Sequence, residues 1–283
     1  MHKNGFIKPF KGFTGRQTQN NIFYIMLILT CLLIPTTNML LNEVNKPYGL
    51  GRPGRIIITA CAADETNWDY GVFEGGVFTH FFVEGNRNTK NCSVEKAFYY
   101  AQNKTHNFDG RNPQIYDGIP GDFYISSYGD ITKKELKNLY VLLICIEDYP
   151  NMDDATYAMN NLHHILDVVF SENVQAFDYE YNLTDAYKKF LLTNNITHVE
   201  YVKTITNADA TKINIENNIT WLAHNTKPGD AVIMYFSGHG GHGCIYVYDD
   251  TITKQELNTY FNNIKTGVNI VIMFNCCHSG SMI

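Results

Sequence analysis

The stretches DAVIMYFSGHGGHG (230–243) and NIVIMFNCCHSGS (269–281) decide the fold that we expect for this chain. Each begins as a short, nearly continuous apolar run and ends in glycine, histidine and small polar residues. Runs of this kind are typical of strands buried on both faces, as in a parallel sheet covered by helices. Two similar runs precede them, YVLLICI (140–146) and HVEYVKTI (198–205). The pattern therefore predicts four parallel strands in series.

Segments with helical periodicity lie between these runs, so the strands are expected to alternate with helices. The periodicity and the capping signals predict four helices, at 158–169, 184–192, 213–222 and 253–261. The last of these opens with a capping box formed by Thr253 and Glu256. Complete crossovers of this kind predict an α/β fold.

The N-terminal half shows the same alternation of strands and helices over fewer residues. RIIITACA (55–62) predicts a strand, SVEKAFYYAQ (93–102) predicts a helix capped by Ser93, and PQIYDGIPGDFYI (113–125) predicts a turn that leads into a strand. The polar stretch 126–138 is typical of a connector with a short capped helix at Thr132 to Glu135. The sheet is therefore expected to hold six strands.

Composition narrows the class of protein. The chain has 283 residues, of which 45% are hydrophobic, and this is enough for one sizeable core. The net charge is −6 and no block of lysine or arginine is present, which argues against a nucleic-acid partner. The seven cysteines are an odd number without paired CxxC spacing, so they indicate neither a disulfide framework nor a zinc site.

The first 44 residues are expected to be an extension outside the domain. Four basic residues up to Arg16 precede an uncharged apolar run at 22–34, which is the layout of an export signal. Counting on to Leu41 reaches the length of a membrane anchor, and a helix or strand of the domain is a third alternative. We expect a secreted or membrane-anchored protein, with the cytoplasm as the alternative.

Histidine and cysteine follow two neighbouring strands at the edge where parallel strands end, which is where functional groups gather in such sheets. A thiol with a free pKa of about 8.5 needs an adjacent base to act as a nucleophile near neutral pH, and a histidine can provide it. The amides of Gly240 and Cys277 are the natural donors to an oxyanion. The run Cys276, Cys277 and His278 argues against zinc, because adjacent residues seldom converge on one metal.

VIMYFSGHGGHG and IVIMFNCCHSGS resemble the large-subunit half of metacaspases, which are caspase-like cysteine peptidases. The resemblance implies a caspase-like α/β/α sandwich and an endopeptidase that acts through a thioester. It further implies that His239 is the base, that Cys277 is the nucleophile and that Cys276 is only its neighbour.

Residues 55–125 resemble the small-subunit half of the same family, which ordinarily follows the catalytic cysteine. Here this half comes first. The resemblance implies a small-subunit half at 45–130 and a large-subunit half at 131–283, which together form one caspase-like domain at 45–283 in circularly permuted order. The alternative is that the chain spans the junction of two tandem copies. If the domain is permuted, we expect that it needs no cleavage between its halves for activity.

Specificity is expected to depart from the family pattern. Metacaspases hold a substrate arginine or lysine in an acidic pocket, but two of its aspartate positions are Asn161 and Asn275 in this chain. Asp64 and Asp69, in a segment that resembles another pocket wall, can restore negative charge or can be ordinary loop carboxylates. The residue before the scissile bond is therefore expected to be basic or neutral and polar.

No cofactor is required by this chemistry, and no metal site is predicted. The family resemblance raises calcium as an option, with oxygen donors at Asp148, Asp153, Asp154, Asp249 and Asp250. The expected partner is a peptide or protein substrate, and we expect a monomer that touches a membrane only through an uncleaved N-terminal segment. The competing functions are a catalytically silent caspase-like interaction module and one half of a tandem copy.

Overall fold

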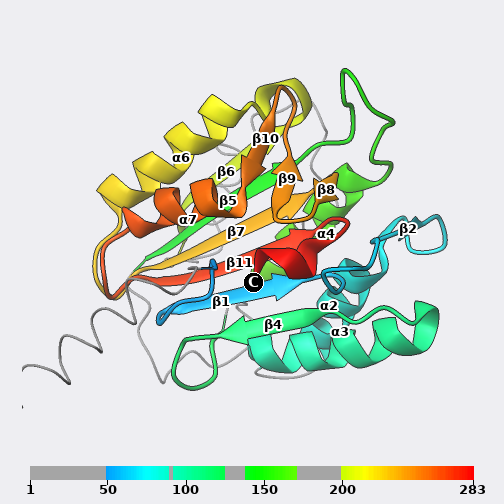
Figure 1. The fold of residues 1–283 in the computed structure, drawn as a ribbon. Coiled ribbons are helices and arrows are strands. Elements are labelled where there is room, and N and C mark those ends of the chain that lie inside the picture. The colour runs from blue at the N-terminus through cyan, green and yellow to red at the C-terminus, as the bar shows by residue number, and fades with distance from the viewer. Residues whose placement is uncertain (1–48, 89–91, 125–137, 171–198) are drawn as a thin grey trace, which may run out of the picture. The chain divides into compact units, whose positions relative to one another are not determined.

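A six-stranded sheet forms the centre of the computed structural model, which describes residues 49–88, 92–124, 138–170 and 199–283 (Figure 1). Its strands, in spatial order, are β4 (Gln114–Asp117), β1 (Arg55–Thr59), β11 (Asn269–Asn275), β7 (Ala231–Ser237), β5 (Leu139–Cys145) and β6 (Val199–Thr206). All neighbours are parallel except β4, which pairs antiparallel with β1. The predicted six-stranded, mostly parallel sheet is confirmed.

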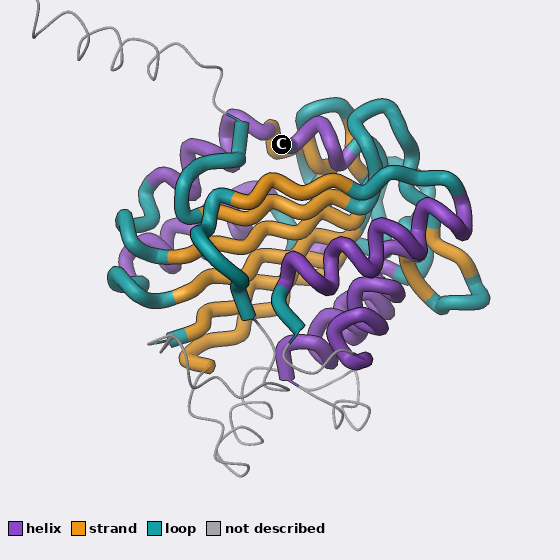
Figure 2. Tube along the Cα trace, turned by 90° about the horizontal axis from the view of Figure 1, so that it is seen from below, coloured by secondary structure: helices purple, strands orange, loops and turns teal. Residues whose placement is uncertain are grey.

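Helices cover both faces of this sheet (Figure 2). One face packs against α2 (Val77–Asn88), α3 (Val94–Asp109) and α4 (Ala158–Phe170), and the other against α6 (Lys212–Asn225) and α7 (Lys254–Asn262). Side chains along each strand alternate between the two cores: Ile56 and Ile58 belong to the first, and Ile57 belongs to the second. Because both faces are buried, the strand sequences are continuously apolar.

The predicted helix starts are confirmed where the structure describes them. Ser93 accepts a hydrogen bond from the Lys96 amide at 3.3 Å and so caps α3. The Thr253 hydroxyl accepts from the Glu256 amide at 3.2 Å, and the Glu256 carboxylate accepts from the Thr253 amide at 2.8 Å. These reciprocal bonds satisfy amide groups that have no partner inside α7.

Several elements differ from the prediction. Helix α2 was not predicted, because its aromatic run FTHFF carries no clear cap and no regular apolar spacing. Strand β4 precedes the turn in residues 113–125, whereas the sequence predicted the turn first, because the pairing of Gln114–Asp117 with β1 fixes the strand there. Short-range patterns also missed the small elements β2 (Asp69–Tyr70), β3 (Gly75–Gly76), β8 (Gly240–Gly241), β9 (Cys244–Tyr246), β10 (Thr251–Thr253), η2 (Asn207–Asp209) and η3 (Ser279–Met282).

Three predicted segments lie outside the described residues: the apolar run at 22–34, the short helix at Thr132 to Glu135, and the helix at 184–192. In the described ranges, every helix is too short or too polar to cross a membrane. The described residues belong to a single compact unit, Tyr48–Ile283.

Candidate active site

The ends of β7 and β11 lie side by side. Their last paired residues are Ser237 and Asn275, and the Gly238 amide donates to the Asn275 carbonyl at 3.4 Å. His239 and Cys277 each follow two residues beyond this pair. The parallel register therefore brings the SGHG and NCCHSG loops to the same edge of the sheet.

Gly240 lies directly against the cysteine turn. A Cβ atom at this position would come within 2.6 Å of the Cys277 carbonyl oxygen and within 2.6 Å of the Cys276 sulfur. No side chain fits at such distances, so the close approach of the two backbones requires glycine. The predicted oxyanion donors, the amides of Gly240 and Cys277, thus belong to chain segments that touch each other.

The histidine side chain is oriented by backbone and aromatic contacts. His239 Nε2 lies 2.6 Å from the Asp153 carbonyl oxygen, and since a carbonyl only accepts, Nε2 carries the hydrogen. In the neutral ring the lone pair is then on Nδ1. Tyr149 also contacts this histidine. The Tyr149 hydroxyl accepts a hydrogen bond from the His239 amide at 2.9 Å and donates one to the Tyr246 carbonyl at 3.1 Å. The rings of Tyr149 and His239 lie 4.8 Å apart.

The two adjacent cysteines differ in environment. Cys277 is half-buried, and its thiol donates to the Asn67 carbonyl at 3.5 Å. Cys276 is only 1% exposed, and burial raises the pKa of its thiol well above the ordinary value. A thiol that is buried and held protonated is a poor nucleophile. Of this pair, Cys277 is therefore the one suited to attack a substrate.

Four polar residues, Asp69, Asn161, Ser237 and Asn275, form a group beneath this edge that we call the pocket cluster. Asn161 donates to the Ser237 hydroxyl oxygen at 3.1 Å and accepts from the Gly76 amide at 2.8 Å. Asn275 donates to the same hydroxyl oxygen at 3.3 Å. A Cβ on Gly76 would lie 2.8 Å from the Asn275 amide group and 3.0 Å from Asp69 Oδ1, so Asp69 belongs to the cluster.

Asp69 is the only acid of the pocket cluster. Burial raises its pKa to about 6, an effect that the hydrogen-bonding side chains of Asn161 and Asn275 only partly offset and that Glu147 reinforces. Its Oδ1 atom is buried and accepts no hydrogen bond from any residue that the structure describes. An ionised carboxylate in this position favours a cationic partner.

A family model described as metacaspase, peptidase C14 domain, matches residues 133–283, which are just over half of the chain. The chain belongs to the metacaspase family. Its fold is accordingly caspase-like, and its family is one of cysteine peptidases.

Curated metacaspases match a shorter stretch. Metacaspase-3 of Trypanosoma cruzi is 30% identical over 90 residues, covering 26% of this chain and 25% of the relative. Metacaspase-1B of Aspergillus fumigatus is 29% identical over 89 residues, covering 25% and 22%. Inactive metacaspase-4 of Trypanosoma brucei brucei is 29% identical over 92 residues, covering 26% of each. The matched region thus spans about a quarter of these relatives.

A solved structure of a Geobacter sulfurreducens protein aligns with 50% of this metacaspase and 50% of its own chain, at 14% sequence identity and a TM-score of 0.32.

The other acidic residues that the sequence predicted for the pocket or for calcium lie outside the pocket cluster of this metacaspase. Asp64 is exposed, and no described contact joins it to the pocket cluster. Among the predicted calcium donors, Asp249 accepts from the Lys212 amide at 2.8 Å and Asp250 lies 3.4 Å from the Lys212 ammonium. Within the described ranges, no group of three or more histidine, cysteine, aspartate or glutamate residues is arranged to hold a metal ion.

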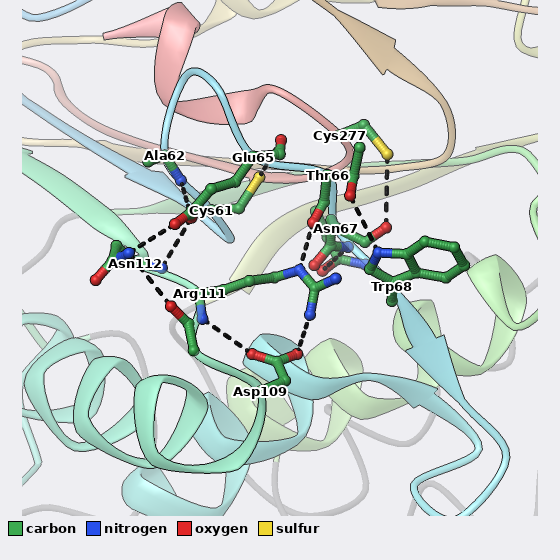
Figure 3. Close-up of polar contacts among 12 residues, drawn as sticks. Cys61, Ala62, Glu65, Thr66, Asn67, Trp68, Asp109, Arg111, Asn112 and Cys277 are labelled. Carbon is green, nitrogen blue, oxygen red and sulfur yellow. Dashed lines mark hydrogen bonds and ion pairs between the residues drawn. The ribbon is translucent and has the colours of Figure 1, made fainter.

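The segment that the sequence predicted to be a pocket wall contains a loop at residues 62–68, which we call the covering loop. Its contact with Cys277 was not predicted. The covering loop follows β1 and reaches Cys277 through the Asn67 carbonyl (Figure 3). The Asn67 side chain donates to Asn275 at 3.2 Å. The same loop carries Trp68, which is 57% exposed. No sequence motif links Asn67 to the nucleophile, because the contact depends on the pairing of β1 with β11.

Proposed function

We propose that this metacaspase is a cysteine endopeptidase in which Cys277 is the nucleophile and His239 the general base. The observation that carries the proposal is the orientation of His239, whose Nε2 hydrogen is directed at Asp153 and whose Nδ1 lone pair is left for a proton. The adjacent strand ends of β7 and β11 support the pairing of this base with the half-buried thiol of Cys277. Nucleophile and base on neighbouring elements are the arrangement that this chemistry needs.

In the proposed reaction, His239 accepts the thiol proton and the sulfur attacks the substrate carbonyl carbon. The amides of Gly240 and Cys277 stabilise the resulting oxyanion. His239 then gives its proton to the leaving amine as the peptide bond breaks and a thioester remains. Water, deprotonated by His239, attacks the thioester and releases the carboxylic acid and the free thiol.

For specificity, we propose that the pocket cluster receives an arginine or lysine side chain before the scissile bond, with Asp69 as its negative partner. The Oδ1 atom of Asp69, which accepts no hydrogen bond from the described residues, supports this choice. The alternative is a neutral polar side chain, supported by the amide groups of Asn161 and Asn275. Both amides already bond to Ser237, and neither carries the negative charge that a substrate cation would need as a partner.

Incubation of the protein with a peptide library, with and without calcium, tests the proposal. Cleavage sites are identified by mass spectrometry for the wild type, Cys277→Ala and the matched control Cys276→Ala. We expect cleavage after basic residues, its loss in Cys277→Ala and its retention in Cys276→Ala. Equal loss in both variants, with both folded, would contradict the assignment of the nucleophile. The calcium arms test the calcium prediction separately.

The second candidate function is a catalytically silent interaction module. Its support is the replacement of two acidic pocket positions by Asn161 and Asn275, whose side chains bond to neighbouring protein groups. One similar protein, inactive metacaspase-4 of Trypanosoma brucei brucei, is described by its name as inactive. A folded wild-type protein that cleaves no library peptide under any condition, and whose Cys277 reacts with alkylating reagents no faster than a free cysteine, would favour this candidate.

We propose in addition that residues 45–283 act as one permuted domain and not as half of a tandem copy. The parallel pairing of β1 with β11, over five residue pairs from Arg55 with Ile270 to Thr59 with Phe274, supports this. Light scattering on a sizing column tests the proposal. Activity of the monomer favours the permuted domain, whereas activity confined to a dimer favours the tandem alternative.

A further inference from the structure

The covering loop is tied both to the nucleophile and to the pocket cluster. Besides the Asn67 contacts with Cys277 and Asn275, the Glu65 carbonyl accepts from the His278 amide at 2.8 Å. A shift of this loop therefore changes the surroundings of the Cys277 sulfur and one wall of the pocket together. Its position is set by contacts outside the active site.

Four residues, Glu65, Asp109, Arg111 and Asn112, hold the covering loop, and we call them the brace (Figure 3). The Glu65 carboxylate accepts from the Ala62 amide at 2.8 Å, from the Asn112 amide at 2.9 Å and from the Asn112 side chain at 2.6 Å. Burial acts to raise the pKa of Glu65, but these hydrogen bonds and the charge of Arg111 outweigh it and leave the pKa below its ordinary value. Glu65 is therefore held as a carboxylate.

Arg111 bridges the two segments of the brace. Its Nε donates to the Thr66 carbonyl, and its guanidinium pairs with Asp109 (Figure 3). The side chains of Arg111 and Asp109 are only 14% and 6% exposed, so solvent screens this pair weakly. The planar guanidinium can bond to a carbonyl and a carboxylate at once, which a lysine ammonium does less well. The same guanidinium lies 6.0 Å from the centre of the Trp68 ring.

The partners in the brace come from distant parts of the chain. Thr66 belongs to the loop after β1, whereas Asp109 and Arg111 lie where α3 ends and the chain approaches the edge strand β4. No brace side chain has a described contact with the Cys277 sulfur or with the pocket cluster. Its influence on the site is exerted through the backbone of Thr66 and Asn67.

We infer that the brace fixes the covering loop against Cys277 in the shape that receives substrate, and that Arg111 is a positioning residue for the proposed peptidase reaction. This inference rests on the proposed function. The covering loop then presents a preset backbone and the exposed ring of Trp68 beside the scissile bond. This fixed position matters because a shift of about 1 Å between the reacting groups can lower the rate of catalysis about 100-fold.

The kinetic test compares Arg111→Gln, the conservative variant Arg111→Lys and a matched control, Lys96→Gln. Lys96 forms an exposed ion pair with Asp122, away from the covering loop. We expect Arg111→Gln to lower kcat/KM for a peptide about 10- to 100-fold, with partial recovery in Arg111→Lys and no change in Lys96→Gln.

A second readout does not depend on peptidase activity. The chain has two tryptophans, so Trp221→Phe leaves Trp68 as the sole indole fluorophore. In this background, Arg111→Gln should make Trp68 easier to quench with acrylamide at an unchanged Tm. If Arg111→Gln folds with wild-type kcat/KM and wild-type quenching, the inference is overturned. If the wild type itself cleaves nothing, the proposed function fails, and the quenching alone decides whether Arg111 fixes the loop.

If Arg111→Gln does not fold, kcat/KM and acrylamide quenching are both measured on Arg111→Lys, which retains the positive charge opposite Asp109. Reduced kcat/KM and greater quenching in Arg111→Lys support the inference. Wild-type values for both overturn it.

Discussion

His239 Nε2 lies 2.6 Å from the backbone carbonyl oxygen of Asp153, and this contact selects the ring nitrogen that is free to accept a proton. The partner is a main-chain atom, so the orientation of the ring is independent of the Asp153 side chain. In the proposed reaction, the loop after β5 thus orients the base, a task that a carboxylate performs in other enzymes.

The first prediction follows from this contact. His239→Gln should lower kcat about 100- to 10,000-fold, because the general base is lost. Asp153→Ala should retain activity within about threefold, since it removes only a side chain that has no part in the proposed proton transfer. Steady-state kinetics on one peptide measures both variants. A large loss in Asp153→Ala with an intact fold would show that the carboxylate, and not the carbonyl, orients the base.

The second prediction concerns pH and specificity. Asp69, with a pKa of about 6, is protonated at lower pH and charged above it. The ratio of kcat/KM for an arginine peptide to that for the matching asparagine peptide should therefore rise with pH, with a midpoint near 6. Taking the ratio cancels every effect of pH that is the same for both substrates. Asp69→Asn should give a ratio that is low and flat across the pH range. A wild-type ratio that does not change with pH would contradict the role of Asp69.

The third prediction concerns stability. The folded pKa of Asp69, about 6, is above the ordinary value of 3.8, so the folded state binds a proton that the unfolded state has already lost between these values. Relative to Asp69→Asn, the wild type should lose about 2 to 3 kcal/mol of unfolding free energy as pH rises from about 4 to above 6. Urea unfolding of both proteins at several pH values measures the difference. A difference that grows in favour of the wild type with rising pH would contradict the burial of this carboxyl.

The fourth prediction concerns Gly240. In Gly240→Ala, the new methyl group would overlap the Cys277 carbonyl and the Cys276 sulfur, so the two loops must separate. We expect a loss of about 1 to 3 kcal/mol in stability together with a marked loss of kcat. Gly243→Asn is the matched control in the same hairpin, since its Cβ meets open space and asparagine tolerates its φ of 69°. Thermal unfolding and kinetics distinguish the two, and equal effects would contradict the steric explanation.

Sequence alone was sufficient for elements whose signal is local. The four central apolar runs became β5, β6, β7 and β11, and Thr253 with Glu256 capped α7 as expected. Continuous apolar runs and capping pairs encode their structure within a few residues. Helix α2 was not predicted because its aromatic residues show no regular helical spacing in the sequence. They form a helix in the structure, where several of them pack into the core.

The sequence by itself determined the family, the six-stranded sheet and the presence of a histidine and a cysteine after neighbouring strands. Only the tertiary structure decided that Asp69 joins Asn161 and Asn275 while Asp64 stays exposed, and that a carbonyl orients His239. It also brought Arg111 to Thr66. The physical reason is that the pattern of a strand depends on adjacent residues. These contacts instead join loops that meet only after β1 has paired with β11 and α3 has packed on the sheet.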